Sequence, residues 1–398
     1  MPDTRREVWI TGIGLVSSLG EGLDAHWDAL ESGKVVADTE TFAPFVNHPL
    51  APLDFDKQIL KKGDQRQMET WQRIGTYAAG LALDDAGIKG DADILARTDL
   101  IVAARGGERD EKVDAAILTG LVKSNGSPIF LNERLMNDLR PTLFLAQLSN
   151  LLAGNISIVH GVTGSSRTVM GEETAGADAV RIGAARISAG QSDIVLVGAA
   201  CNSDRYDQIM HFEFRGLPWR GEPGGVWQRA EAGGGLAFGS AAAFLVLEAV
   251  DNARARGAKP HARLRAVETG WMRRNPGAIA NMLESRFAEA TPGLEAGASA
   301  VISGASGVEP ATGEERAFLA RHPELPVRAI GTQFGHSMEV HFPISVAVAA
   351  MSVAHGKLYD GRDGSEVEQP FAGPLRHALV TGIGHWRGEA TAVVETAD

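Results

Sequence analysis

The sequence contains very little cysteine and no long hydrophobic run. Cys201 is the only cysteine among 398 residues, which excludes an intramolecular disulfide and a cysteine-rich metal site. The apolar runs, such as residues 241–246, are far shorter than the roughly 20 residues that a membrane-spanning helix requires. These absences predict a chain that folds in a reducing compartment and does not span a membrane.

Basic residues are outnumbered by acidic ones, 38 against 50, so that the net charge is −12. This balance disfavours nonspecific attraction to nucleic acid or anionic lipid, although a local basic patch remains possible. The first residues are polar and lack the apolar region of a signal peptide, which favours a cytoplasmic protein.

Short apolar segments alternate with alanine-rich segments of helical spacing. Strands are predicted at residues 8–13, 100–104, 194–197, 244–247, 300–302 and 379–381, and helices at residues 68–86, 140–152, 174–188 and 344–354. This alternation predicts an α/β fold with helix-covered sheets. The length predicts two packed halves, residues 1–250 and 251–398, that meet within residues 248–265.

Residue types alone indicate little catalytic chemistry. Cys201 follows a predicted strand and is interpreted as a small buried thiol. His336 and His341 are close in sequence, but no third ligand stands at helical spacing, so we expect no metal and no cofactor. The glycines at 12–14 and 233–235 lack the context of a nucleotide-binding loop and are interpreted as turns.

Several segments together resemble the elongating β-ketoacyl-ACP synthases, over nearly the whole chain. They are residues 8–20 (VWITGIGLVSSLG) with Trp27 and Gly33, Pro141, Leu145 and Asn150, residues 153–158 (AGNISI) and 164–169 (GSSRTV), residues 185–190 with Asp193 and residues 197–199, and residues 245–248 (LVLE) with residues 253–258 (ARARGA). The resemblance implies a thiolase-like fold, a five-layered αβαβα dimer. It also implies dimerisation through the strand before the nucleophile, here residues 167–170, and acyl carrier protein as a partner.

The position of the family's nucleophilic cysteine falls on Glu173. A carboxylate cannot hold an acyl chain as a stable thioester, but the helix N-terminus that favours a thiolate also favours this anion. The plainer alternative is an ordinary glutamate in the first turn of an exposed helix.

The family polarises the malonyl thioester with two histidines. The first position falls on Ser303, and the second falls on His336, which is retained. Gly331 replaces the lysine expected five residues before His336. One hydroxyl and one imidazole make a poorer enolate site, because loss of one such donor typically costs about 10² to 10³ in rate.

The family's C-terminal glycine loop corresponds to residues 382–388, the gate loop. Ile383 stands at the position of the gating phenylalanine, beside Gly384, and Trp386 and Arg387 are additions. Residues 105–111 are charged where condensing relatives are aliphatic, which indicates either an exposed loop or an altered acyl tunnel.

These replacements predict a chain-length-factor type subunit of a fatty acid or polyketide synthase, which pairs with an active ketosynthase and shapes its acyl tunnel. Two alternatives stay open: an atypical or decarboxylating synthase, with Glu173 where priming decarboxylases carry glutamine, and an acyl-binding homodimer. Whether the chain is an enzyme is therefore undecided.

The densest basic stretch includes Lys61, Lys62 and Arg66. Because carrier proteins of this kind are acidic, these residues are the candidate docking patch. A solvated helix face balanced by neighbouring acidic residues is the alternative.

Overall fold

The computed structural model describes residues 5–140, 142–171, 173–295 and 297–397. A mixed sheet runs through the molecule in the order β11-β10-β12-β13-β9-β1-β8-β6-β4-β5. Its strands are β1 (Val8–Ser17), β4 (Asp99–Ala103), β5 (Ser166–Val169), β6 (Ile194–Cys201), β8 (Ala241–Ala249), β9 (Ala262–Gly270), β10 (Ser299–Ser303), β11 (Val327–Ala329), β12 (His377–Ile383) and β13 (Glu389–Glu395). β2 (Gly20–Glu21) pairs with β1, and β3 (Asn47–His48) pairs with β7 (Phe238–Gly239).

This sheet divides into two halves of five strands. β1, β8, β6, β4 and β5 form one half, and β9, β13, β12, β10 and β11 form the other. The halves are joined through β1 and β9 by two residue pairs, Trp9 with Arg263 and Ile10 with Ala262. The six predicted strands all form; five are longer than the predicted apolar stretch, and β4 has the predicted length but begins and ends one residue earlier.

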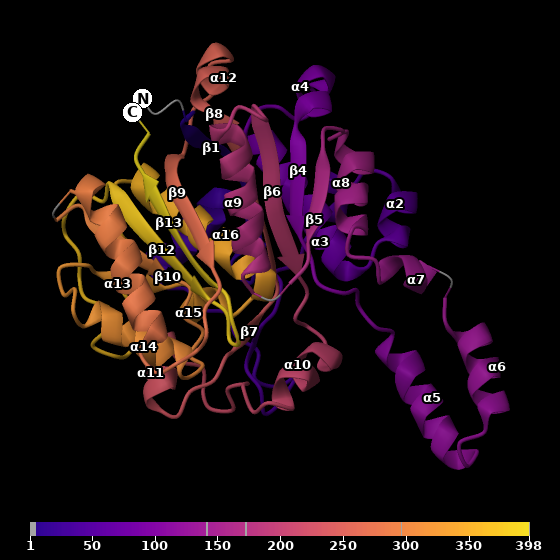
Figure 1. Ribbon diagram of the computed structural model, residues 1–398. Coiled ribbons are helices and arrows are strands. Elements are labelled where there is room, and N and C mark those ends of the chain that lie inside the picture. Colours follow the sequence, from indigo (N-terminus) through magenta and orange to yellow (C-terminus); the bar gives the residue numbers. More distant parts are fainter. Residues whose placement is uncertain (1–4, 141, 172, 296, 398) are drawn as a thin grey trace.

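Helices cover both faces of each half and make the fold a five-layered thiolase-like αβαβα arrangement (Figure 1). α9 (Ala175–Ser188) and α16 (His341–Ala354) form the middle layer, α3 (Thr70–Asp85) and α8 (Leu151–His160) cover the first half, and α13 (Ala278–Ala290) and α14 (Ala311–Leu319) cover the second. α16 is buried on all sides, as an apolar helix between two sheets must be.

The glycines at positions 12 and 14 do not form a turn, contrary to the sequence-based interpretation. They lie inside β1, and a Cβ atom at Gly14 would lie 1.9 Å from the carbonyl oxygen of Ala78 in α3. At Gly12 it would lie 2.4 Å from the carbonyl oxygen of Ala82. The missing side chains therefore let α3 pack directly on the strand backbone.

The helix predicted over residues 140–152 is also corrected. The chain instead forms α7 (Thr142–Ala146), a turn, and then α8, which extends to His160. Ser149 and Asn150 lie in the turn, and both residue types favour turns over helix interiors. Residue 141 lies outside the described residues.

The remaining helices are α1 (Gly22–Ser32), α2 (Lys62–Gln67), α4 (Ala92–Arg97), α5 (Glu111–Lys123), α6 (Pro128–Asp138), α10 (Tyr206–Glu213), α11 (Val226–Glu231), α12 (Val250–Ala255) and α15 (Gly331–Phe334).

α5 and α6 form a helical hairpin that projects away from the body (Figure 1). No helix in the described part of the chain is long and apolar enough to cross a membrane.

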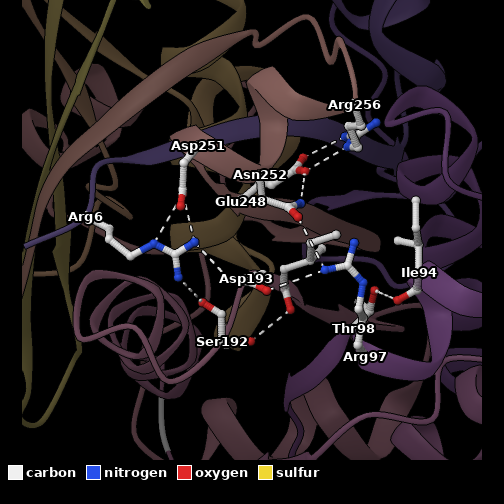
Figure 2. Close-up of polar contacts among 11 residues, drawn as sticks. Arg6, Ile94, Arg97, Thr98, Ser192, Asp193, Glu248, Asp251, Asn252 and Arg256 are labelled. Carbon is white, nitrogen blue, oxygen red and sulfur yellow. Dashed lines mark hydrogen bonds and ion pairs between the residues drawn. The ribbon is translucent and has the colours of Figure 1, made fainter.

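The segment between the two halves is held by an ion-pair network (Figure 2). The buried Glu248 carboxylate pairs with Arg256 at 2.6 Å and also accepts hydrogen bonds from Thr11 and Asn252. Arg6 lies between Asp251 and Asp193. Glu248 of the LVLE segment and Arg256 of the ARARGA segment thus hold the segment between the two halves against the rest of the protein.

Candidate active site

Glu173 is a buried carboxylate immediately before the central helix. It lies between β5 and α9, two residues before the first helical residue, and it is 8% exposed. The unpaired backbone N–H groups at a helix N-terminus favour an anion at this place. The reading of Glu173 as an exposed helix-start residue is therefore wrong, because the side chain points into the protein.

His385 reaches Glu173 from the gate loop. Its Nδ1 lies 2.5 Å from Glu173 Oε1, and its Nε2 lies 3.0 Å from the hydroxyl oxygen of Ser306, in the segment after β10. Burial alone would raise the pKa of Glu173, but the hydrogen bond and charge of His385 outweigh it and hold that pKa below its usual value. Glu173 is thus ionised at neutral pH and held by the imidazole.

The gate loop is closed upon itself and packed against the start of α9. The amide of Gly384 donates to the carbonyl of Gly388 at 2.9 Å, and Arg274 donates to the carbonyl of Gly384 at 2.9 Å. Gly388 has a positive φ of 83°, and a Cβ atom there would lie 2.3 Å from Thr174 Oγ1. Glycine at position 388 therefore lets the loop bring His385 to Glu173.

Two further histidines lie beside this pair. The ring of His336 lies 4.5 Å from that of His341 and 4.8 Å from that of His385, centroid to centroid. Both nitrogens of His336 and both nitrogens of His341 are buried without a hydrogen-bond partner. Burial lowers the pKa of His341 to about 3 and holds the pKa of His336 well below its usual value, so both rings are neutral.

Ser303 lies at the end of β10 but does not face Glu173. Its hydroxyl donates to Glu315 Oε1 at 2.8 Å and accepts from the amide of Ala305 at 3.0 Å. Thr381 donates to the same Glu315 oxygen at 2.5 Å. The ring of His341 lies near Gly304, the residue after Ser303.

The structure therefore brings together Glu173, His336, Ile383 and Gly384, while Ser303 is bonded elsewhere. Sequence reasoning missed His385, Ser306 and the site role of His341. The only available signal for His385 was its place within the glycine-rich gate loop.

A pocket of about 500 Å³ opens beside Glu173, and we call it the arginine pocket. It is lined by Arg105, Gly171, Glu173, His211, Phe212, Arg215, Met338, Trp386 and Arg387. The guanidinium of Arg215 lies 4.5 Å from the ring centre of Trp386, and that of Arg105 lies 5.7 Å from Phe212. Three guanidinium groups thus surround a hollow in a chain whose net charge is −12.

Cys201 is buried at the end of β6, in agreement with the interpretation of a small buried thiol. Burial raises its pKa to about 12, so the thiolate is not formed at neutral pH. Glu339 lies nearby, accepts from the amide of Arg105 at 3.2 Å, and has its pKa raised by burial to about 7.

The predicted docking residues Lys61, Lys62 and Arg66 are exposed around the start of α2. Lys62 pairs with Asp56 at 2.5 Å, so part of the positive charge is balanced locally.

Comparison with known proteins gives one family. Residues 5–253 match the model of the β-ketoacyl synthase N-terminal domain. The chain is 27% identical over 269 residues to 3-oxoacyl-acyl-carrier-protein synthase 2 of Vibrio harveyi, covering 66% of this chain and 62% of the relative. It is 28% identical over 384 residues to the oxytetracycline polyketide putative beta-ketoacyl synthase 1 of Streptomyces rimosus, covering 89% and 86%.

Solved structures share the fold at low identity. The ishigamide ketosynthase/chain length factor superposes with a TM-score of 0.79 at 21% identity, covering 99% of this chain and all of that one. A beta-ketoacyl synthase from Burkholderia phymatum STM815 superposes with a TM-score of 0.78 at 19% identity, with the same coverage. The family match extends over more than half of the chain, and the chain therefore belongs to the β-ketoacyl synthase family.

Proposed function

We propose that this chain is a chain-length-factor type subunit of a fatty acid or polyketide synthase, which pairs with an active β-ketoacyl-ACP synthase and shapes its acyl tunnel. The observation that carries the proposal is the buried Glu173 at the nucleophile position, with its carboxylate bonded to His385. A carboxylate held in this way is neither a thiol nor free to accept an acyl group.

The rest of the described site offers no substitute nucleophile of the family's kind. Cys201 is the only cysteine, and it is buried with its pKa at about 12. Ser303, at the position of the first family histidine, is bonded to Glu315. Condensation by this chain alone is therefore disfavoured.

A pairing surface supports the partner part of the proposal. β5 is the last strand of the sheet, so its outer edge has no partner strand within the described chain. Large apolar side chains are exposed directly after β5, on α7 and α8, on the α5–α6 hairpin and in the turn between α7 and α8: Leu118, Val122, Ile129, Leu135, Met136, Phe144, Leu145, Leu148, Ile158 and Met170. An unpaired strand edge beside such a surface favours an obligate dimer.

The partner is proposed to be an intact ketosynthase, with a homodimer as the alternative. We expect co-expression with a ketosynthase encoded beside this gene to give a one-to-one complex in native mass spectrometry. Condensation of malonyl-ACP should require both chains. Elongation by the isolated chain would refute the proposal. A homodimer that does not bind the ketosynthase would refute the pairing between the two chains.

Variants locate the pairing surface. Phe144→Glu and Met170→Glu change side chains that are 73% and 66% exposed, and they should release the partner. The matched control is Val35→Glu, 44% exposed in the segment after α1, which should pair normally.

A second candidate, a malonyl decarboxylase, is favoured by one feature of the site. Neutral imidazoles of His336 and His341 could donate hydrogen bonds to a thioester oxygen, and the arginine pocket could receive a carboxylate. Carbon dioxide release from malonyl-ACP by the isolated chain, lost in His336→Ala, would select this candidate. Release at the level of the buffer blank would dismiss it.

A further inference from the structure

A very small buried cavity lies among unpaired polar atoms of the site. Its volume is about 10 Å³, and its lining includes Glu173, His336, His341 and Ile383. Glu173 Oε2 and all four ring nitrogens of the two histidines lack a hydrogen-bond partner. A buried polar atom without a partner is unfavourable, and these five atoms belong to side chains that line one cavity, so the cavity calls for an occupant. A cavity of this size holds one water molecule or one ion.

Glu173 and His336 line this cavity, and His385, which is bonded to Glu173, offers a third ligand atom beside them. One atom each from Glu173, His336 and His385 lies within 4.8 Å of the other two. From this geometry we infer that Glu173, His336 and His385 bind a single Zn²⁺ ion. The three ligands come from the start of α9, the segment after α15, and the gate loop.

The ligand chemistry suits zinc. Two imidazoles and one carboxylate form a known type of zinc site, with bonds of about 2.0 to 2.2 Å. In a tetrahedral site the ligand atoms would stand roughly 3.3 Å apart, so shifts of about 1 to 2 Å complete the set. The ion takes the place of the proton shared between His385 Nδ1 and Glu173 Oε1, and that proton leaves to solvent.

Ser306 supplies the outer contact that such a site needs. A metal-binding histidine donates its second ring N–H to a fixed acceptor, which sets the tautomer and the ring orientation. His385 Nε2 lies 3.0 Å from Ser306 Oγ, which leaves Nδ1 for the metal. Ser306 is thus a positioning residue, and the sequence-based expectation of no metal rested on a missing third ligand that the fold brings from distant segments.

The inferred ion would tie the gate loop to α9 in one position. This role does not depend on the proposed pairing with a ketosynthase, so the metal test and the pairing test can fail separately. His341 lies outside the three-ligand set and serves as the matched control, since it is as buried as His336 and also unpaired.

The test is the metal content of the untagged full chain, purified without chelator and measured by plasma mass spectrometry. We expect one equivalent of zinc, removed by chelator and restored by added Zn²⁺. Titration of the metal-free protein with Zn²⁺ should release a proton, seen as a dependence of the binding heat on the buffer. Ser306→Ala should weaken binding by about 10- to 100-fold, and His385→Gln should weaken it more.

Controls separate ligand loss from misfolding. His336→Gln should lose the ion, while His341→Gln should keep one equivalent, and circular dichroism should show both to be folded. Replacement by Co²⁺ should give visible absorption bands that shift in Ser306→Ala. No zinc in the purified chain together with no binding by the metal-free protein, or equal loss in His341→Gln, would overturn the inference and leave a single water molecule in the cavity.

Discussion

His385 joins Glu173 to Ser306, with its two ring nitrogens 2.5 Å from the carboxylate and 3.0 Å from the hydroxyl. The gate loop, the start of α9 and the segment after β10 are therefore connected through one imidazole. The Glu173 carboxylate thus has a specific hydrogen-bond partner on a distant segment.

This contact predicts how stability depends on acid. The pKa of Glu173 in the folded state lies below its usual value, so its contribution is present above about pH 4.3 and is lost as the pH falls through the folded-state value. Glu173→Gln should be less stable than the native chain at pH 7, with a smaller difference below pH 4. Urea unfolding at a series of pH values measures this. An equal difference at all pH values would contradict it.

Glu339 predicts the opposite trend. Burial raises its pKa to about 7, so the folded state keeps a proton that the unfolded chain releases above about pH 4.3. Stability should therefore fall between about pH 4.3 and 7, by at most about 1.4 kcal/mol per pH unit. Glu339→Gln should remove this fall. The control is the exposed Glu366→Gln, which should follow the native profile.

The proposal that Glu173 occupies the family's nucleophile position predicts the outcome of an acylation assay. The native chain should gain no mass with acyl-ACP or acyl-CoA, whereas Glu173→Cys should gain one acyl group in intact-protein mass spectrometry. A stable adduct near the start of α9 in the native chain would overturn the noncatalytic interpretation.

Condensation should not return with the cysteine alone. We expect Glu173→Cys combined with Ser303→His to elongate faster than either single variant. The second change also crowds the buried Ser303–Glu315 contact, at a cost of about 1 to 3 kcal/mol. Elongation by Glu173→Cys at the rate of an ordinary synthase would refute the role given to Ser303.

The connection between the halves predicts a stability difference. Arg256→Ala leaves the fully buried Glu248 with only Thr11 and Asn252 as donors and should cost about 3 kcal/mol. Arg6→Ala breaks pairs whose acidic partners are 45% and 68% exposed and should cost less than about 1 kcal/mol. Urea unfolding measures both losses of stability, provided that the two variants unfold with equal m-values. Equal losses of stability in the two variants would contradict the prediction that the ion pair of the buried Glu248 contributes more than the ion pairs of Arg6.

The candidate docking patch predicts a salt-dependent rate. Reversing Lys61, Lys62 and Arg66 to glutamate should slow the association of acidic carrier protein, most strongly at low salt. The charge-matched control reverses the exposed Lys259, Arg321 and Arg376 and should leave the rate unchanged. Identical kinetics of both triple variants across a salt titration would exclude the patch.

Local patterns in the sequence were enough for the fold and for part of the site. The period of apolar residues predicts the strands and helices, and the segments around β1, β8 and α9 carry the family resemblance. That resemblance leads to Glu173, His336 and Ile383 by position along the chain. The turn interpretation of the glycines at 12 and 14 failed because close packing against α3, a tertiary contact, requires them.

Only the tertiary structure decided what these residues do to one another. Glu173 and His385 are 212 residues apart, and no local pattern reports a hydrogen bond between them. The direction of the Ser303 hydroxyl toward Glu315 likewise depends on how β10, β12 and α14 pack. Periodicity records which face of an element is buried, whereas the partner of a buried polar atom is set by whichever distant segment packs against it.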